Sequence, residues 1–362
     1  MAGKKFFKIL LTLMAVMMLA LAGGCAGSSD NEETATIGVS LPTIDLQRWN
    51  QDGANLKNML NEKGYAVDLE YAGDDGSKQI AQIERMIDDG VDCLVIAPVD
   101  AYNLTGVLSK AKTKKIPVIA YDRLIMESDG VSYHVTFDNK GVGTLIGQYI
   151  EKKLGLAEGK GPYNVEFFAG SSDDNNAYLV NDGVFEVLKK YIISGKLVVP
   201  SNQTDFSSIS IPRWAEDIAK QRMAALLSTF YKDGKKLDAV ISPNDNISYG
   251  IVAALADLGR TAGTDWPLIT GQDADRQAVK NIISGQQSMT VFKDTRILAE
   301  HCADMVEDIL KGKDVRTNNS TDYDNQVKIV PTYVCTPISI DKDNLKEELV
   351  DSDYYKAEDI GL

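Results

Sequence analysis

Short apolar runs alternate with amphipathic helical segments along almost the whole chain, and this alternation restricts the fold more than any other feature. Between the runs, apolar residues recur at i, i+3, i+4 and i+7, most clearly over residues 142–154 and 247–258, the spacing of a helix with one buried face. This pattern predicts an α/β fold with doubly wound parallel sheets. It occurs twice in tandem, so we expect two similar lobes. The expected strands are residues 36–41, 66–71, 93–97, 118–121 and 132–137 in the first part, and 164–169, 196–200, 239–242, 268–270 and 289–292 in the second.

Polar and aromatic residues follow several of the expected strands at the point where each strand ends. Asp122 and Arg123 follow the run 118–121, and Asn244 and Asp273 follow two runs of the second set. Open α/β sheets bind ligands at the carboxyl ends of their strands. Because the pattern repeats in both sets, it predicts one site to which both lobes contribute.

The residue types at these strand ends suit a ligand rich in hydroxyl groups. Asp122 is an acceptor, Arg123 is a rigid fork of donors, and an asparagine amide is both, as each hydroxyl is. Trp49 and Trp214 offer flat apolar faces that a sugar ring can stack on. For each tryptophan, ordinary core packing is the alternative, and for Asp122 with Arg123 the alternative is a structural ion pair.

The charge balance and the motifs that are missing exclude several classes of function. The chain has 38 basic and 52 acidic residues, a net charge of −14, which disfavours nucleic acid as a partner. Nucleotide-binding glycine loops and the hydrolase nucleophile elbow are missing from the sequence. We therefore expect neither an enzyme nor a bound cofactor or metal. Asp173 and Asp174 favour a helix N-cap over a cation site, and residues 321–325 favour a polar turn over a calcium loop.

The N-terminus has the pattern of an export signal. Three lysines precede an apolar run at 9–21, which is too short to span a bilayer but suits a signal peptide. Small residues then precede Cys25, which predicts a signal peptide at 1–24, lipidation of Cys25 and a polar tether at 25–34. The mature protein is then extracytoplasmic and held at the cell membrane by lipid alone; ordinary cleavage or an uncleaved anchor is the alternative.

Four motifs in combination resemble the type I periplasmic sugar-binding proteins of ABC transporters, in particular the multiple-sugar-binding and D-xylose-binding receptors. The motifs are Tyr121-Asp122-Arg123, Asp174-Asn175-Asn176-Ala177, Gly271-Gln272-Asp273-Ala274 and Phe292-Lys293-Asp294-Thr295-Arg296. The resemblance covers nearly the whole chain after the tether.

The resemblance implies a role for each of nine residues. Trp49 and Trp214 would sandwich a pyranose ring. The N-terminal lobe would bind it through Arg48, Asp122 and Arg123. The C-terminal lobe would do so through Asn176, Asn244 and Asp273, with Lys293 near the hinge; the alignment leaves Asn175 as an alternative to Asn176.

The resemblance also implies two lobes joined by a three-segment hinge. The N-terminal lobe would hold residues 35–138 and 294–331, and the C-terminal lobe 139–293 and 332–350. The crossings would lie near 137–140, 292–294 and 330–332.

The function implied is capture of a monosaccharide by hinge closure and its delivery to an ABC transporter permease, by a monomeric protein. Aldoses such as galactose, glucose, xylose and arabinose suit the expected site. Pro243 before Asn244 departs from the xylose-binding pattern and so disfavours narrow xylose specificity. A sugar receptor that signals to a chemotaxis or sensor-kinase partner is the alternative.

Overall fold

Six parallel strands form the first sheet, in the order β11-β5-β4-β3-β1-β2. They belong to a computed structural model that describes residues 34–362 apart from residue 233. Because β1 lies between β2 and β3, the order of the strands reverses beside β1, and the sheet is doubly wound as predicted. The strands are β1 (Thr36–Leu41), β2 (Ala66–Tyr71), β3 (Cys93–Ile96), β4 (Val118–Tyr121), β5 (Tyr133–Phe137) and β11 (Thr332–Cys335).

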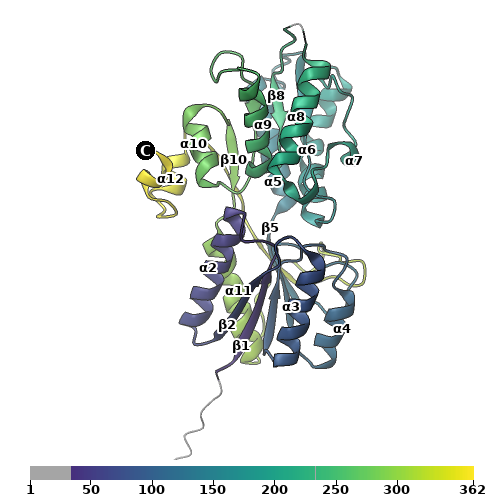
Figure 1. Cartoon of the computed structure of the whole chain (residues 1–362), viewed down its shortest axis with the longest axis vertical. Coiled ribbons are helices and arrows are strands. Elements are labelled where there is room, and N and C mark those ends of the chain that lie inside the picture. The colour runs from purple at the N-terminus through teal and green to yellow at the C-terminus, as the bar shows by residue number, and fades with distance from the viewer. Residues whose placement is uncertain (1–33, 233) are drawn as a thin grey trace, which may run out of the picture. The chain divides into compact units, whose positions relative to one another are not determined.

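Helices cover both faces of this sheet because the strand residues point alternately to the two sides. In β3, Val95 packs in the core beneath α2 (Gln47–Glu62) and α11 (Thr295–Leu310), whereas Leu94 and Ile96 pack beneath α3 (Gly76–Asp89) and α4 (Thr105–Thr113). Figure 1 shows the two pairs of helices on opposite sides of the strands. We call this sheet with its helices the N-terminal lobe.

The C-terminal lobe is built around a second parallel sheet with the same winding. Four strands lie in the order β7-β6-β8-β9, and a separate antiparallel pair is formed by β10 and β12. An isolated bridge between Gln272 and Val291 joins the loop after β9 to β10. The strands are β6 (Tyr163–Phe167), β7 (Leu197–Val198), β8 (Ala239–Ile241), β9 (Leu268–Ile269), β10 (Met289–Phe292) and β12 (Ile338–Asp341).

Two helices cover each face of the second sheet. One face packs against α5 (Asn139–Leu154) and α6 (Asn175–Ile193), and the other against α8 (Glu216–Phe230) and α9 (Asp245–Asp257). A smaller core joins β10 and β12 to the C-terminal residues. The remaining helices are α7 (Phe206–Ile209), the 3₁₀ turn η1 (Pro212–Trp214), α10 (Arg276–Ser284), α12 (Leu345–Leu349) and α13 (Ala357–Ile360).

The chain passes between the lobes at three places, and one differs from our expectation. The first two passages follow β5 and β10. The third was expected at residues 330–332, but β11 pairs with β5 in register Thr332 to His134 and so belongs to the first sheet. The third passage therefore follows Cys335, and the residues of β11 belong to the N-terminal lobe. The short run 332–335 has no pattern that indicates which sheet the strand joins.

The three cysteines of the described residues are packing residues. Cys93, Cys302 and Cys335 are free and buried, and burial raises the pKa of the Cys93 thiol to about 12. The signal segment, Cys25 and nearly all of the tether lie outside the described residues. In the part of the chain that is described, no helix is both long and apolar enough to cross a membrane.

Candidate functional site

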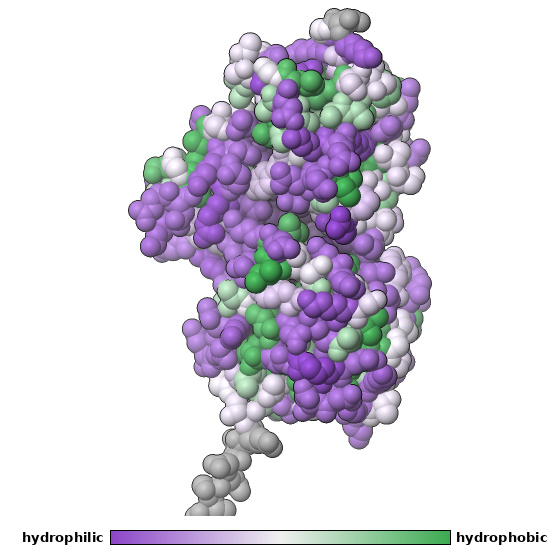
Figure 2. Space-filling view, in the orientation of Figure 1, coloured by the Kyte–Doolittle hydropathy of each residue, from purple (hydrophilic) through white to green (hydrophobic). Residues whose placement is uncertain are grey.

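A polar cavity lies where the carboxyl ends of the two sheets face each other, and all nine residues predicted for the site line it. The empty space inside it, counted to the open side and so including open solvent, is about 410 Å³. Figure 2 shows a hollow between the lobes in a largely hydrophilic face. The lining residues are Leu46, Arg48, Trp49, Asp122, Arg123, Asn139, Asp174, Asn176, Trp214, Asn244, Gln272, Asp273 and Lys293.

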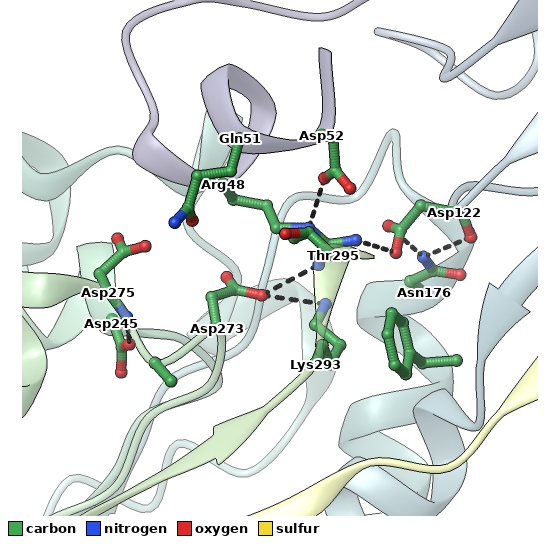
Figure 3. Close-up of polar contacts among 12 residues, drawn as sticks. Arg48, Gln51, Asp52, Asp122, Asn176, Asp245, Asp273, Asp275, Lys293 and Thr295 are labelled. Atoms are coloured by element: carbon green, nitrogen blue, oxygen red, sulfur yellow. Dashed lines mark hydrogen bonds and ion pairs between the residues drawn. The ribbon is translucent and has the colours of Figure 1, made fainter. Parts of the chain in front are cut away.

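Arg48, in the first turn of α2, lies at the centre of the polar network. Its Nε donates to Asp52 Oδ2 at 2.5 Å, its Nη2 to Asp122 Oδ2 at 2.6 Å and its Nη1 to Asp273 Oδ1 at 3.2 Å. Figure 3 shows the guanidinium between these three carboxylates. Lys293 Nζ lies 3.0 Å from the same Asp273 oxygen. The network therefore contains groups from both lobes.

Asp52 holds Arg48 from the side away from the cavity. It is one helical turn from Arg48 along α2, and its other oxygen accepts from Tyr121 Oη at 2.6 Å. Burial raises the pKa of Asp52 to about 6, although the nearby Arg48 charge opposes the shift. Asp52 and Tyr121 fix the direction of the Arg48 side chain, as partners behind a site residue commonly do.

Asp122 follows β4 and is held as a carboxylate. Burial by itself would raise its pKa, but the charges of Arg48 and Lys293 outweigh burial and keep the pKa well below its ordinary value. The backbone at Asp122 has φ of 61°, a left-handed conformation uncommon for a non-glycine residue. Its carbonyl oxygen accepts from Thr136 Oγ1 at 2.7 Å. Non-glycine residues in this conformation cluster at functional sites.

Arg123 pairs with Asp174 and not with Asp122, so the structural ion pair considered as the alternative for Asp122 and Arg123 is not formed. The Nε of Arg123 lies 2.8 Å from Asp174 Oδ2, and its Nη1 donates to the carbonyl of Pro98 at 3.1 Å. Adjacent residues at a strand end point in different directions, so Asp122 turns toward Arg48 on α2 and Arg123 turns toward α6. Arg48 is thus the main partner of Asp122.

The two tryptophans both reach the cavity. The guanidinium carbons of Arg48 and Arg123 lie 5.5 and 5.2 Å from the Trp49 ring centre, within cation–π range. Trp49 packs in the core of the N-terminal lobe and also lines the cavity. The residue therefore has both a packing role and a place in the site. Trp214 ends η1 with φ of 54°, and its Nε1 is buried without a hydrogen-bond partner.

Gly170 leaves room for the Trp214 ring. A Cβ added at Gly170 would lie 2.1 Å from Trp214 Cη2 and 2.2 Å from Trp214 Cζ2. Non-bonded carbon atoms do not approach this closely, so the ring would have to move. Gly170 follows β6, at the carboxyl end of the second sheet. The close approach of this backbone sets the position of the ring in the cavity wall.

At the start of α6, Asn176 lines the cavity and Asn175 does not. Asn176 Nδ2 donates to the carbonyl and to Oδ1 of Asp122 at 3.1 and 3.3 Å, whereas Asn175 lines a different hollow. Asp174 caps the helix by accepting from the Asn176 amide at 2.9 Å, the role predicted for it. No group of acidic, histidine or cysteine side chains that could hold a metal ion occurs among the described residues.

Two buried carboxyls lie next to Asp273. Asp245 accepts from Gln287 Nε2 at 2.8 Å, from Thr290 Oγ1 at 2.9 Å and from the Asp275 amide at 3.0 Å. Figure 3 shows Asp245 and Asp275 side by side near Asp273. Burial and the neighbouring Asp273 charge raise the pKa of Asp275 to about 7. Burial, with the adjacent Asp275, also raises the pKa of Asp245.

Comparison with known proteins identifies this architecture. The periplasmic binding protein domain family matches residues 37–314. The chain belongs to this family. It is 44% identical to the multiple sugar-binding periplasmic receptor ChvE of Rhizobium radiobacter, over 97% of this chain and 99% of the relative. It is 34% identical to the D-xylose-binding periplasmic protein of Haemophilus influenzae, over 95% and 98% of the two chains.

A solved structure of the family has the same fold as this chain. It is an ABC transporter solute-binding protein from Clostridium phytofermentans, solved with bound β-D-glucose. The TM-score is 0.87 at 47% identity, over 90% of this chain and 99% of that chain. The fold of this periplasmic binding protein is thus the type I fold that the motifs predicted.

Sequence reasoning missed four lining residues of this periplasmic binding protein: Leu46, Asn139, Asp174 and Gln272. Asn139 Oδ1 and Gln272 Oε1 are buried without a hydrogen-bond partner. Gln272 stands inside the motif 271–274, next to the chosen residue Asp273, whereas Asn139 lies in none of the four motifs. A place inside a motif was thus the only sequence signal for a lining residue such as Gln272. It does not tell which of two neighbouring polar side chains faces the cavity.

Proposed function

We propose that this periplasmic binding protein captures an aldose outside the cytoplasm by closure of its lobes and delivers it to an ABC transporter. The observation that carries the proposal is the cavity, in which both lobes contribute donors, acceptors and a tryptophan. The relatives named above are a multiple sugar-binding receptor and a D-xylose-binding protein, and the related structure holds glucose.

The charge balance of the cavity favours a neutral ligand. Three cationic side chains and three carboxylates line it, and each cation contacts a carboxylate. An anionic ligand would meet no cation that is free among these residues. A sugar hydroxyl, by contrast, can donate to a carboxylate and accept from a guanidinium or an amide, and a hydrogen bond to a charged group contributes about 1.5–3 kcal/mol.

Binding and closure are coupled because each lobe carries part of the polar set. We infer that Arg48, Asp122, Arg123 and Trp49 bind the sugar from one lobe. We infer that Asn176, Asn244, Asp273 and Trp214 bind it from the other, with Lys293 at the passage between them. A ligand held by both sets binds the closed arrangement better and shifts the population toward it. The permease would recognise the closed arrangement of this monomer.

Calorimetric titration with galactose, glucose, xylose and arabinose tests the proposal. The sample is the chain from Gly27 onward, and we expect a Kd of about 1 μM, equivalent to roughly −8 kcal/mol, for at least one sugar. Asp122→Ala should abolish the heat while the circular dichroism spectrum is retained. If wild-type protein gives no heat with any of the four aldoses, the proposed ligand class is wrong.

A further inference from the structure

The C-terminal residues of the chain pack on the C-terminal lobe next to the cavity wall. Tyr355 is 3% exposed and lies in the small core that β10, α10 and α12 share. Figure 1 shows α12 beside α10. The ring of Tyr354 meets Phe292 edge to face, with centroids 4.6 Å apart. The two tyrosines are thus fixed to the lobe that carries Asp273.

The hydroxyl group of Tyr355 joins the two lobes. It donates to the carbonyl of Ala274 at 2.9 Å, within its own lobe. It accepts from Gln47 Nε2 at 2.7 Å, and Gln47 is the first residue of α2 in the other lobe. Ala274 follows Asp273 and Gln47 precedes Arg48, so this link runs beside the contact of Arg48 with Asp273.

Gln47 makes a second bond to the same lobe. Its Oε1 accepts from the Arg276 amide at 3.2 Å, so both ends of one side-chain amide are used across the boundary. Burial raises the pKa of Tyr355, and the hydroxyl therefore stays protonated and able to donate. Separation of α2 from the C-terminal lobe would break the two interlobe bonds of Gln47 and leave the Tyr355 hydroxyl with its intralobe partner, the Ala274 carbonyl.

We propose that Tyr355 is a positioning residue for sugar binding: it holds the start of α2 against the C-terminal lobe, so that Arg48 and Asp273 face one cavity. The inference rests on the proposed sugar-binding function for its effect on affinity. Its structural part, the link between the lobes, does not depend on the ligand. Tyr355 itself does not line the cavity, so it acts through Gln47 and Ala274.

Tyr355→Phe removes the hydroxyl and keeps the ring. We expect the Kd for the sugar to rise about three- to tenfold, the net value of one or two hydrogen bonds, through a faster dissociation rate. Small-angle scattering without sugar should show a larger radius of gyration, because the closed arrangement loses a stabilising contact. Tyr231→Phe is the matched control, since the Tyr231 hydroxyl bonds Glu166 at 2.9 Å inside the C-terminal lobe and its loss should leave affinity and radius unchanged.

A double-mutant cycle with Gln47→Ala separates positioning from a purely structural role. The two substitutions should be non-additive in Kd, because each breaks the same bond. Additive effects, or wild-type affinity and dissociation rate in Tyr355→Phe, would overturn the proposal. If wild-type protein binds no aldose, the proposed function fails, and scattering alone decides: an unchanged radius in Tyr355→Phe then overturns the link as well.

Discussion

Arg48 and Asp273 are 225 residues apart in sequence, and their side chains meet at 3.2 Å in the cavity between the lobes. Arg48 lies on the first helix of one lobe, and Asp273 follows β9 of the other. The same guanidinium also contacts Asp52 and Asp122. One side chain therefore joins the packing of α2, the end of β4 and the second lobe into a single network.

Arg48→Lys should weaken sugar binding by about 100-fold and lower the free energy of unfolding by several kcal/mol. An ammonium cannot reach three carboxylates with the fixed fork of a guanidinium, and removing one member of a buried ionic network leaves the others unpaired. Calorimetry and urea unfolding measure the two effects.

Arg85→Lys is the matched control for that substitution. Arg85 also contacts three carboxylates, of Asp68, Glu70 and Asp89, but 43% of its side chain is exposed. Exposed ion pairs contribute at most about 1 kcal/mol, so affinity should not change. Equal losses in both variants would show that the buried position of Arg48 has no special importance.

Gly170→Ala should weaken binding at least tenfold while the protein remains folded. The added methyl group would occupy the position of the Trp214 ring, so the ring must move within the cavity wall. Calorimetry measures the loss of sugar affinity. The change in tryptophan fluorescence on sugar addition should also differ from that of the wild-type protein. Gly106→Ala, where a Cβ meets nothing within 4 Å, should leave binding intact; wild-type affinity in Gly170→Ala would contradict the assigned role of Trp214.

Asp275→Asn should flatten the decrease in stability between about pH 4 and pH 7. Burial raises the pKa of Asp275 to about 7 in the folded protein, against about 3.9 for a solvated aspartate. The folded state then binds more protons than the unfolded state across this window, so wild-type stability falls as the pH rises through it. The asparagine side chain does not titrate, so Asp275→Asn removes the proton uptake that causes this fall in stability.

Urea unfolding at several pH values measures this effect. The slopes of wild type and Asp275→Asn should differ by up to about 1.4 kcal/mol per pH unit. Identical slopes in the two proteins would show that Asp275 titrates at an ordinary pKa.

Cys25→Ser should release the protein from membranes in a bacterial host. Lipidation needs the thiol, and anchoring by acyl chains is lost without it. Cell fractionation measures membrane association, and labelling with a fatty acid measures lipid attachment. Ser29→Ala in the polar tether is the control, and this variant should stay at the membrane. Lipid labelling of Cys25→Ser would exclude Cys25 as the anchor.

The sequence by itself determined ten of the twelve strands among the described residues and nine of the residues that line the cavity. Hydrophobic period fixes which face of each helix and strand is buried, so every expected strand is present. Parallel strands bring their carboxyl ends to one edge, which accounts for Asp122, Arg123, Asn244 and Asp273. The roles of the other five residues were implied by the family resemblance, and all nine line one cavity.

Only the tertiary structure decided which of these residues are partners. Asp122 stands next to Arg123 in sequence, yet it pairs with Arg48. A side chain at a strand end contacts residues of other helices and strands, and the sequence alone does not say which of these lie nearby. For the same reason β11 joins the first sheet and Asn176, not Asn175, faces the cavity. The link from Gln47 through Tyr355 to Ala274 depends on three segments that meet only after the lobes fold.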